Sequence, residues 1–390
     1  MGGLKIAFYT DTYLPSMDGV VTSILNFKEE LERRGHKVYI FAAGDKESKK
    51  KYSKKDVFIY QGVEFTPYPQ YNVALFPYNS IFKLNDLDVD LIHVQTPMVM
   101  GIAGLMAGKV LRRPVVSSFH TIVTNKPIVD AYYPKNKHLK LLAKKSMSRY
   151  LKFFYNRCNA VIAPTQTIGK MLSSYKITDV KVVPNSIDIK TLNPKADGSA
   201  VRKLAGFNSS NRVILYLGRL SREKKIEVLL KAASMLMKKD SSIRLLVGGS
   251  GPAEQHYKSI ASSLGIMDNT TFLGFVDQKV LAQVYAAADV VCLPSTFETQ
   301  GIVLIEAMAV GKPVVGADYL AIKEMIHNGK NGEKFKPGDY TSCAKKIEKF
   351  LNNPAHYRSN AVRTAKEFSR ERVTDRLLDV YNLVLSNRAI

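Results

Sequence analysis

The amino-acid sequence predicts an α/β protein built from two doubly wound domains. Its 390 residues exceed the length that one hydrophobic core usually supports. Strand-like and helix-like patterns alternate from the first residues, and the alternation restarts at Arg212, after a stretch rich in Pro, Asn, Gly and Ser. We therefore expect an N-terminal domain over residues 1–187 and a C-terminal domain over residues 188–369, each with a parallel sheet between helices.

The first half contains short apolar runs bounded by turn signals, which are typical of buried strands. After the first run, Val20–Arg34 carries apolar residues at helical spacing, and Gly35 ends the predicted helix. The Lys-rich segment from Lys46 to Lys55 is most simply a solvated loop. The predicted strands are one that ends near Thr10, then Val38–Phe41, Leu91–Val94, Val115–Ser118, Ala160–Ala163 and Val180–Val183.

The second half follows the same order of strands and helices, without a fixed-period sequence repeat. Residues 188–211 are predicted to form a linker. A last helix-like segment, about residues 370–390, follows the final predicted strand, and its pattern leaves open whether it packs back on the first half. The predicted strands are Arg212–Leu217, Ile243–Val247, Thr271–Leu273, Val290–Leu293 and Val314–Gly316.

The composition is that of a globular protein, with 46% hydrophobic and 23% charged residues, which argues against a disordered or fibrous class. The longest apolar stretch, residues 98–108, is shorter than the roughly 20 residues that a membrane-spanning helix needs. The N-terminus leads directly into a strand-like run and carries no signal-peptide pattern. We expect a cytoplasmic protein whose three cysteines, Cys158, Cys292 and Cys343, are reduced and buried.

A net charge of +23 indicates an anionic partner, which can be nucleic acid, an acidic membrane or a phosphorylated substrate. No helix-turn-helix, zinc-finger or RNP-type motif accompanies the charge, so we do not expect nucleic-acid binding. The charge is concentrated between Lys126 and Arg157, a segment with nine Lys or Arg residues and one acid, Asp130.

Residues 136–156, within this segment, predict a basic amphipathic helix. Apolar residues such as Leu139, Leu142 and Phe154 recur at helical spacing, which suits binding to an anionic membrane surface. The alternative is a helix that packs on the core and has a basic solvated face. The basic residues assigned to membrane binding are Lys137, Lys140, Lys144, Lys145, Arg149 and Lys152.

Two cations follow the first strand of the second half. Gly218-Arg219 forms the predicted turn at the end of this strand, and Lys224 follows shortly afterwards. The carboxyl end of a parallel strand is where such sheets bind ligands, and two cations suit a diphosphate. The spacing alone leaves a solvated basic loop equally open.

The segment from Glu298 to Ala309 carries the strongest chemical pattern. It follows a predicted strand and opens a helix, so the amides near Gly301 are expected to form a helix N-terminus that can receive phosphate. The alternative for Glu298 is that it only favours the helix dipole. Glu306 lies in an otherwise apolar helix and needs donors such as ribose hydroxyls, because burying a lone carboxylate is costly.

Together these segments resemble the family 4 glycosyltransferases, and the resemblance covers essentially the whole chain. It implies the GT-B architecture, in which two Rossmann-like domains face each other across a cleft. The N-terminal domain would bind the acceptor and the C-terminal domain the nucleotide sugar. The matching motifs are Asp18-Gly19-Val20, Ser118-Phe119-His120-Thr121, Pro184-Asn185-Ser186-Ile187-Asp188, Gly218-Arg219-Leu220 with Lys224, Gly249-Ser250-Gly251-Pro252, and Glu298 with Glu306.

The resemblance also implies roles for these positions. Arg219 and Lys224 would hold the donor diphosphate and neutralise the leaving group, and Glu298 would bind hydroxyls of the donor sugar. His120 would contact the sugar and the reacting centre, although the residue pattern by itself favours a hydrogen-bonded structural histidine. Further donor contacts are implied for Gly19, Gly218, Gly251, Thr299, the amides of Gln300, Gly301 and Ile302, and Glu306, which would bind the ribose.

Two positions depart from the usual pattern of the family. Gln300 stands where many members have Phe, and Ser186 stands where the hinge motif usually has Gly. The Thr299-Gln300 form resembles a subset that includes diacylglycerol glucosyltransferases and phosphatidylinositol mannosyltransferases. We therefore expect a lipid acceptor and peripheral attachment to the inner face of the cell membrane.

The Asp88-Val89-Asp90 sequence resembles the D-x-D of metal-dependent transferases of another fold, but it precedes a predicted strand and is interpreted as a turn. His93, in that strand, is expected in or near the core. The predicted reaction is retaining transfer of a hexose from a nucleoside diphosphate sugar, without a metal or other cofactor. A soluble sugar or glycan acceptor, nucleotide-sugar epimerisation and glucan synthesis are the alternatives.

Overall fold

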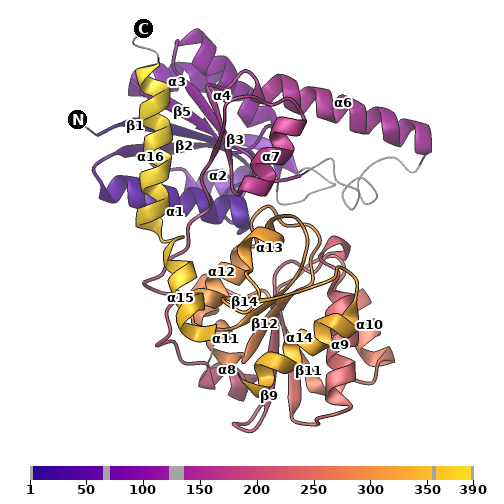
Figure 1. Ribbon diagram of the computed structural model, residues 1–390. Helices are drawn as coiled ribbons and strands as arrows, with labels where there is room; N and C mark the ends of the chain where they lie inside the picture. Colours follow the sequence, from indigo (N-terminus) through magenta and orange to yellow (C-terminus); the bar gives the residue numbers. More distant parts are fainter. Residues whose placement is uncertain (1–2, 65–70, 123–135, 354–356, 388–390) are drawn as a thin grey trace. The chain divides into compact units, whose positions relative to one another are not determined.

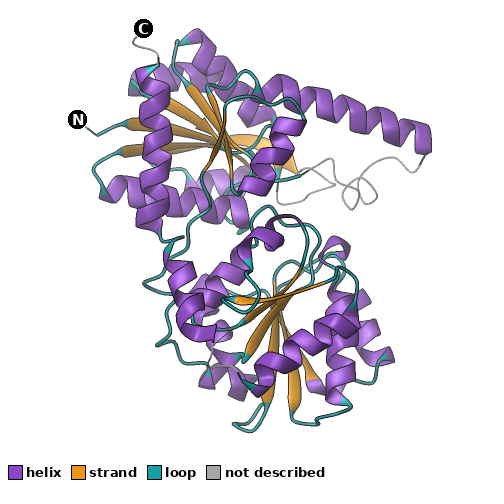
Figure 2. Ribbon diagram, viewed as in Figure 1, coloured by secondary structure: helices purple, strands orange, loops and turns teal. Residues whose placement is uncertain are grey.

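The chain folds into two compact units, each with a sheet between helices (Figures 1 and 2). The computed structural model describes residues 3–64, 71–122, 136–353 and 357–387. One unit comprises residues 1–186 and 370–390, and the other comprises residues 187–369. Both are α/β folds, as the alternating patterns predict.

The sheet of the first unit has eight strands in the order β4-β3-β2-β1-β5-β6-β7-β8. All neighbouring strands are parallel except β3 and β4, which form an antiparallel pair at one edge. The strands are β1 (Lys5–Thr10), β2 (Lys37–Gly44), β3 (Val57–Glu64), β4 (Asn72–Ala74), β5 (Leu91–Val94), β6 (Val115–Ser118), β7 (Ala160–Ala163) and β8 (Val180–Val182).

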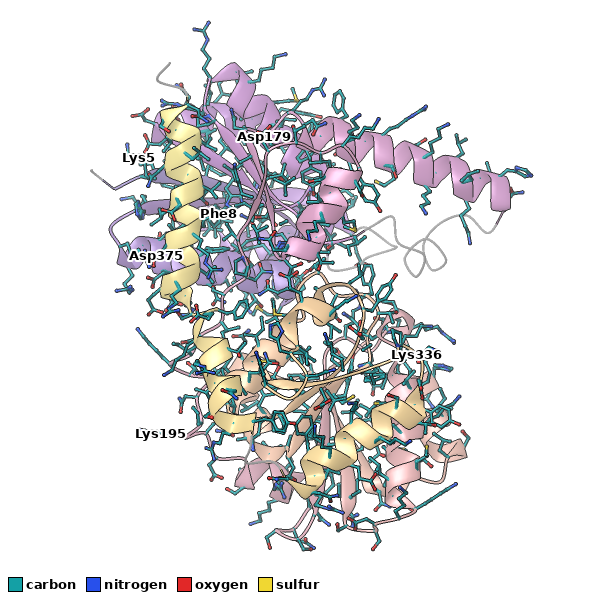
Figure 3. The ribbon with its side chains drawn as sticks, viewed as in Figure 1. Lys5, Phe8, Asp179, Lys195, Lys336 and Asp375 are labelled. Atoms are coloured by element: carbon teal, nitrogen blue, oxygen red, sulfur yellow. The ribbon has the colours of Figure 1, made fainter. Side chains whose placement is uncertain are left out.

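Helices α1 (Gly19–Arg33) and α16 (Arg370–Ser386) cover one face of this sheet (Figure 1). Their apolar side chains share a core with β1 residues such as Phe8, which is labelled in Figure 3. Asp375 of α16 forms an ion pair with Arg34 at 2.5 Å. The other helices of the unit are α2 (Lys46–Tyr52), α3 (Ser80–Leu87), α4 (Val99–Val110), α6 (Lys137–Tyr155) and α7 (Gln166–Ser174), with a 3-10 turn η1 (Pro77–Asn79).

The sheet of the second unit has six parallel strands in the order β11-β10-β9-β12-β13-β14. The strands are β9 (Arg212–Leu217), β10 (Ile243–Gly248), β11 (Thr270–Gly274), β12 (Val290–Leu293), β13 (Val314–Ala317) and β14 (Gly332–Phe335). The helices are α8 (Ser199–Leu204), α9 (Ile226–Met237), α10 (Glu254–Ser263), α11 (Leu281–Ala287), α12 (Ile302–Ala309), α13 (Leu320–Met325), α14 (Tyr340–Asn352) and α15 (Arg358–Lys366), with 3-10 turns η2 (Arg222–Lys224), η3 (Met267–Asn269) and η4 (Gln278–Val280).

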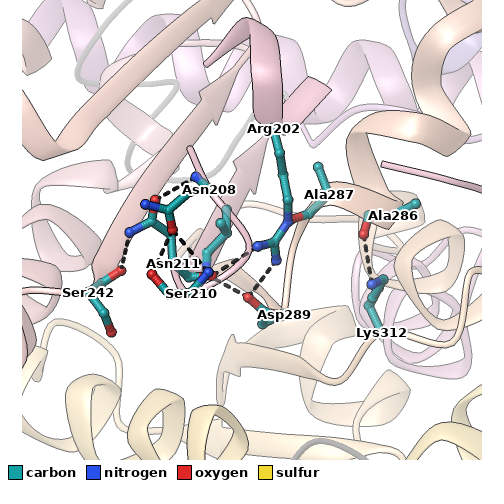
Figure 4. Close-up of polar contacts among 10 residues, drawn as sticks. Arg202, Asn208, Ser210, Asn211, Ser242, Ala286, Ala287, Asp289 and Lys312 are labelled. Carbon is teal, nitrogen blue, oxygen red and sulfur yellow. Dashed lines mark hydrogen bonds and ion pairs between the residues drawn. The ribbon is translucent and has the colours of Figure 1, made fainter. Parts of the chain in front are cut away.

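The segment expected to be a linker contains helix α8, which is anchored to the second sheet (Figure 4). Arg202 of α8 forms an ion pair with Asp289 at 2.8 Å and donates hydrogen bonds to the carbonyl oxygens of Ala287 and Asn211. Asp289 also accepts a hydrogen bond from the amide of Val213 at the start of β9. These contacts explain why a segment with linker-like composition belongs to the folded unit.

Two other expectations about elements were wrong or incomplete. Part of the Lys-rich segment expected to be a loop is helix α2, because Asp45 caps its N-terminus by accepting a hydrogen bond from the amide of Ser48, which is buried. Strands β3, β4 and β14 lie outside the predicted set. The three cysteines are buried and free, as expected, and the thiols of Cys292 and Cys343 lie 3.7 Å apart.

Candidate active site

The strand order of the second unit reverses between β9 and β12, which lie side by side although they are far apart in sequence. Ligands of open α/β sheets bind at such a point, outside the carboxyl ends of the strands. Lys224 follows β9 and Glu298 follows β12, and Lys224 Nζ lies 2.7 Å from Glu298 Oε1. The side chains of both residues are largely buried, so this ion pair is shielded from water more than a surface pair.

Two glycine turns at this end of the sheet pack closely against each other. Gly218 donates an amide hydrogen bond to the carbonyl of Gly248, and a Cβ on Gly249 would lie 2.0 Å from the Gly218 carbonyl oxygen. Gly249 has φ of +119°, a conformation that side chains disfavour. Gly251 is constrained by packing alone, since a Cβ there would lie 2.4 Å from the Leu220 carbonyl oxygen. These glycines shape the loop that carries Arg219.

The N-terminus of α12 lies directly after Glu298. Gly301 is its N-cap residue with φ of +80°, and the helix proper begins at Ile302, as the sequence predicts. Gly301 has no side chain, so the N-cap residue itself makes no capping hydrogen bond to the first amides of the helix. The amides here therefore form the kind of site that favours an anion. Gln300 is buried just before the cap, and Thr299 is half-buried.

Glu306 lies one helical turn further along α12 and is buried. The hydroxyl of Tyr285, from α11, donates a hydrogen bond of 2.7 Å to Glu306 Oε2. Burial raises the pKa of Glu306 above its ordinary value, and the bond from Tyr285 opposes that increase. Tyr285 is therefore part of this site, and nothing in its sequence context indicates that role.

In the first unit, Gly19 is the first residue of α1. The carboxylate of Asp18 caps this helix by accepting hydrogen bonds of 2.9 Å from the amides of Val20 and Val21. No atom of the described residues lies within 4 Å of the place that a Cβ on Gly19 would take, so packing among these residues does not require glycine there. This leaves room for a ligand to approach the backbone.

His120 is half-buried and follows β6, and its Nε2 lies 3.0 Å from Oε1 of Gln95, the residue after β5. Burial lowers the pKa of His120 to about 4, so the ring is neutral at physiological pH. Gln95 is fully buried and was missed by sequence reasoning. Its position directly after a buried strand is a signal that could have indicated it.

His93 and the D-x-D sequence make structural contacts. The His93 ring is buried, with Nδ1 2.6 Å from the Tyr381 hydroxyl and Nε2 2.8 Å from the Ser118 hydroxyl. Asp88 is the C-cap of α3 and forms an ion pair with Arg113 at 2.6 Å, while Asp90 accepts a hydrogen bond from the amide of Lys5. The D-x-D sequence thus lies between a helix and the next strand.

Helix α6 differs in burial along its length. Leu151, Phe154 and Tyr155 near its C-terminal end are buried, whereas the N-terminal turns extend away from the sheet of the first unit (Figure 1). There the side chains of Leu139, Leu141 and Leu142 are 54%, 66% and 61% exposed. Of the basic residues assigned to the membrane, Lys144, Lys145, Arg149 and Lys152 are exposed, Lys140 is half-buried, and the side chain of Lys137 lies outside the described part of the structure.

Comparison with known proteins identifies the family. The family described as glycosyl transferases group 1 matches residues 199–368, and glycosyltransferase family 4 matches residues 17–191. The chain belongs to glycosyltransferase family 4. It is therefore a hexosyltransferase with a GT-B fold, as the motifs predict. None of its described helices has the length and apolar character needed to cross a bilayer.

Relatives of this glycosyltransferase differ in substrate. An α-monoglucosyldiacylglycerol synthase of Streptococcus pneumoniae is 28% identical over 98% of this chain and 87% of its own length. A GDP-mannose-dependent α-mannosyltransferase of Corynebacterium glutamicum is 27% identical over 84% of this chain and 76% of its own. The structure of Anabaena HepE in complex with UDP and glucose matches with a TM-score of 0.78 at 22% identity, covering 97% of this chain and 99% of that one, which supports the fold.

Proposed function

We propose that this glycosyltransferase moves a hexose from a nucleoside diphosphate sugar to a hydroxyl of a membrane lipid, with retention of configuration and without a catalytic metal. The observation that carries the proposal is the Lys224–Glu298 ion pair beside the N-terminus of α12. A cation, a carboxylate and helix amides there match the diphosphate and the sugar hydroxyls of a nucleotide sugar.

In this proposal the second unit binds the donor. Arg219 and Lys224 neutralise the charge that develops on the leaving diphosphate, and the amides of Gln300, Gly301 and Ile302 add hydrogen bonds to it. Glu298 accepts hydrogen bonds from sugar hydroxyls once the diphosphate draws Lys224 away. Glu306, already bonded to Tyr285, accepts a hydrogen bond from a ribose hydroxyl. Gly218 and Gly251 shape the loop that admits the phosphates, and Thr299 contacts the donor beside Glu298.

Retention is proposed to follow from attack on the same face of the sugar that the nucleotide leaves. A double displacement would need a carboxylate nucleophile on the opposite face, and the family pattern supplies none. A phosphate oxygen of the leaving group then takes the proton of the acceptor hydroxyl. His120 contacts the sugar as a neutral hydrogen-bonding group, because its low pKa keeps it uncharged. Gly19 leaves space for the diphosphate.

The lipid acceptor and the membrane surface are supported by helix α6. Exposed leucines in its first turns are flanked by lysines, and this combination suits the interface of an anionic membrane. The diacylglycerol-directed activity in the name of the S. pneumoniae relative points the same way. We place the protein on the cytoplasmic face of the membrane as a peripheral protein.

A panel of labelled donors tests this function. The protein is incubated with UDP-glucose, GDP-mannose or ADP-glucose, together with liposomes that contain diacylglycerol or phosphatidylinositol, or with soluble sugars. One donor is expected to label a lipid that partitions into organic solvent. Label found only in a soluble glycan would replace the lipid acceptor with a soluble one, and an interconverted free nucleotide sugar would indicate an epimerase.

A further inference from the structure

Gln95 and His120 are held in fixed positions at the carboxyl ends of two neighbouring strands. The backbone amide of Gln95 donates a hydrogen bond of 2.8 Å to the carbonyl of Tyr9 in β1. The amide of Phe119, next to His120, donates one of 2.8 Å to the carbonyl of Ile162 in β7. Each residue is therefore anchored to the strand on its far side, and their side chains meet over the β5–β6 pair.

The contact between the two side chains is specific in its polarity. The carbonyl oxygen of the Gln95 amide lies 3.0 Å from Nε2 of His120, an arrangement that favours the tautomer in which Nε2 carries the proton and donates it. In a neutral imidazole the other nitrogen, Nδ1, is then the acceptor. Burial lowers the pKa of His120 to about 4, and the neighbouring His93 is also neutral, since burial lowers its pKa to about 3.

Gln95 is an unusual choice if its role is only structural. Its side chain is 1% exposed, and its Nε2 finds no hydrogen-bond partner within the described parts of the chain. A buried donor without a partner is destabilising, and an apolar residue of the same shape avoids that penalty. Among the described residues, the only side-chain hydrogen bond of Gln95 is the one to His120, which points to a role through that residue.

We propose that Gln95 is a positioning residue that fixes His120 in the Nε2-protonated tautomer, so that Nδ1 accepts a hydrogen bond from a hydroxyl of the donor sugar. This inference rests on the proposed function, because His120 is assigned there to the sugar. Gln95 suits the task because an amide carbonyl accepts a hydrogen bond without attracting a proton onto the ring. A carboxylate in its place would favour the imidazolium, which cannot accept.

The tautomer can be measured without any assay of activity. The chain has seven histidines, so 15N-histidine labelling gives few signals, and His120→Asn identifies the one of interest. In the parent protein the His120 signals should show a proton on Nε2. In Gln95→Met, which keeps the shape and removes the acceptor, a substantial fraction should move to the Nδ1-protonated form. A parent ring protonated on Nδ1, or an unchanged tautomer in Gln95→Met, would overturn the assignment.

Kinetics and stability then separate positioning from simple packing. Gln95→Met should lower kcat by about tenfold, the size expected for one misdirected hydrogen bond. Because the substitution removes the buried donor without a partner, the melting temperature should be no lower than that of the parent, and Gln61→Met, at an exposed site in the same unit, is the control for the substitution itself. Gln95→Glu should raise the pKa of His120 toward its ordinary value of about 6.5 and make kcat fall below that pH, where the parent keeps its activity.

The outcomes distinguish the two levels of the argument. If Gln95→Met loses melting temperature and activity together while Gln95→Glu keeps the parental pH profile, Gln95 is a packing residue and the inference fails. If the parent has the expected tautomer but turns over no nucleotide sugar, the proposed function is wrong. The contact of His120 with a donor sugar is then wrong as well. Measuring the parent first therefore tells which of the two is wrong.

Discussion

The ion pair between Lys224 and Glu298 joins two residues that a bound donor would use separately. A diphosphate carries more charge than the Glu298 carboxylate and should attract Lys224 toward itself, which leaves Glu298 to accept hydrogen bonds from sugar hydroxyls. In the free protein the pair neutralises two largely buried charges. We infer that the pair keeps the empty site stable and separates when the donor binds.

Glu298→Gln and Lys224→Ala should therefore each lower turnover by about a hundredfold or more, since each removes a contact to the reacting sugar or to the leaving group. Donor turnover under saturating conditions and circular dichroism of the folded protein are the measurements. Lys225→Ala is the matched control, because Lys225 is adjacent in sequence and pairs with Glu227 instead. Near-parental turnover in either site variant would show that the substituted residue does not contact the reacting sugar or the leaving group.

The two carboxylates of the D-x-D sequence are predicted to play no part in catalysis. Asp88 is paired with Arg113, and Asp90 accepts a backbone hydrogen bond, so both already have structural partners. Asp88→Asn and Asp90→Asn should retain parental turnover, and the parent should keep its activity in EDTA. A strict requirement for added Mg²⁺ or Mn²⁺ that either substitution abolishes would show that this site binds a catalytic metal.

Local sequence patterns were enough to name candidate site residues, but they did not reveal which residues those candidates contact. The positions of Lys224 and Glu298 after buried strands could be read from local patterns. Their contact depends on the strand order of the sheet, which local patterns do not reveal. Tyr285 and Gln95 were missed for the same reason: each acts on a residue that is distant in the chain, through a hydrogen bond made only in the fold.

At the scale of elements, helix α6 combines two environments. Its last turns pack in the core of the first unit, and its first turns expose three leucines among lysines. The interpretation as a core-packed helix is confirmed for the last turns, and membrane binding stays a prediction for the first turns. We predict that the first turns make the membrane contact.

Replacing Lys137, Lys140, Lys144 and Lys145 with Ser should weaken binding to anionic liposomes and slow transfer to a lipid acceptor, while donor hydrolysis continues. The physical reason is that each basic residue near an anionic surface contributes on the order of 1 kcal/mol. Liposome flotation is the measurement. The same change at Lys46, Lys49, Lys50 and Lys51 of α2 removes equal charge from another helix of this unit and is the control. If the α6 variant floats with anionic liposomes as well as the parent does, the basic face of α6 is only solvated and does not bind the membrane.

Helix α16 is joined to the sheet by the buried His93, whose ring contacts the Tyr381 hydroxyl. Burial lowers the pKa of His93 to about 3 in the folded protein, against about 6.5 in an unfolded chain. Between these values only the unfolded state binds the proton, so stability is lost as the pH falls below 6.5. At pH 5 the expected loss is about 2 kcal/mol.

His93→Gln should reduce this pH dependence, because glutamine can keep a hydrogen bond and does not titrate. Urea unfolding measures the free energy of unfolding of the parent and of the variant at pH 5 and at pH 7. The change between the two pH values is then compared, so that any effect of the substitution that does not depend on pH cancels. A pH dependence equal to that of the parent would assign the acid sensitivity to other groups.

Many of the strands that the sequence predicted correctly are buried ones. Strands β1, β5, β6, β7, β9 and β12 are short apolar runs, and burial on both faces explains their composition. Strand β3 was missed because its second half is exposed and carries polar residues. Helix α8 was missed because Arg202 anchors it through long-range contacts, while its neighbours in sequence have a linker composition.

At the scale of the whole molecule, the prediction of membrane binding rests on the net charge of +23. An anionic surface attracts such a chain over a distance set by ionic strength, about 8 Å in physiological salt. Binding to liposomes with anionic lipid should therefore weaken steadily as salt rises, and neutral liposomes should bind poorly. Flotation at a series of salt concentrations measures both, and binding that is insensitive to salt would point to a purely apolar attachment.

The most direct test of the proposed reaction is the NMR spectrum of its product. The α-linked nucleotide sugar that labels lipid in the donor panel is incubated with the protein, lipid vesicles and EDTA, and the glycolipid is isolated. We expect a hexosyl lipid whose anomeric carbon shows the larger one-bond C–H coupling constant of an α linkage, which separates the two anomers of both glucosides and mannosides. A β-linked product, or no glycolipid until a divalent metal is restored, would contradict it.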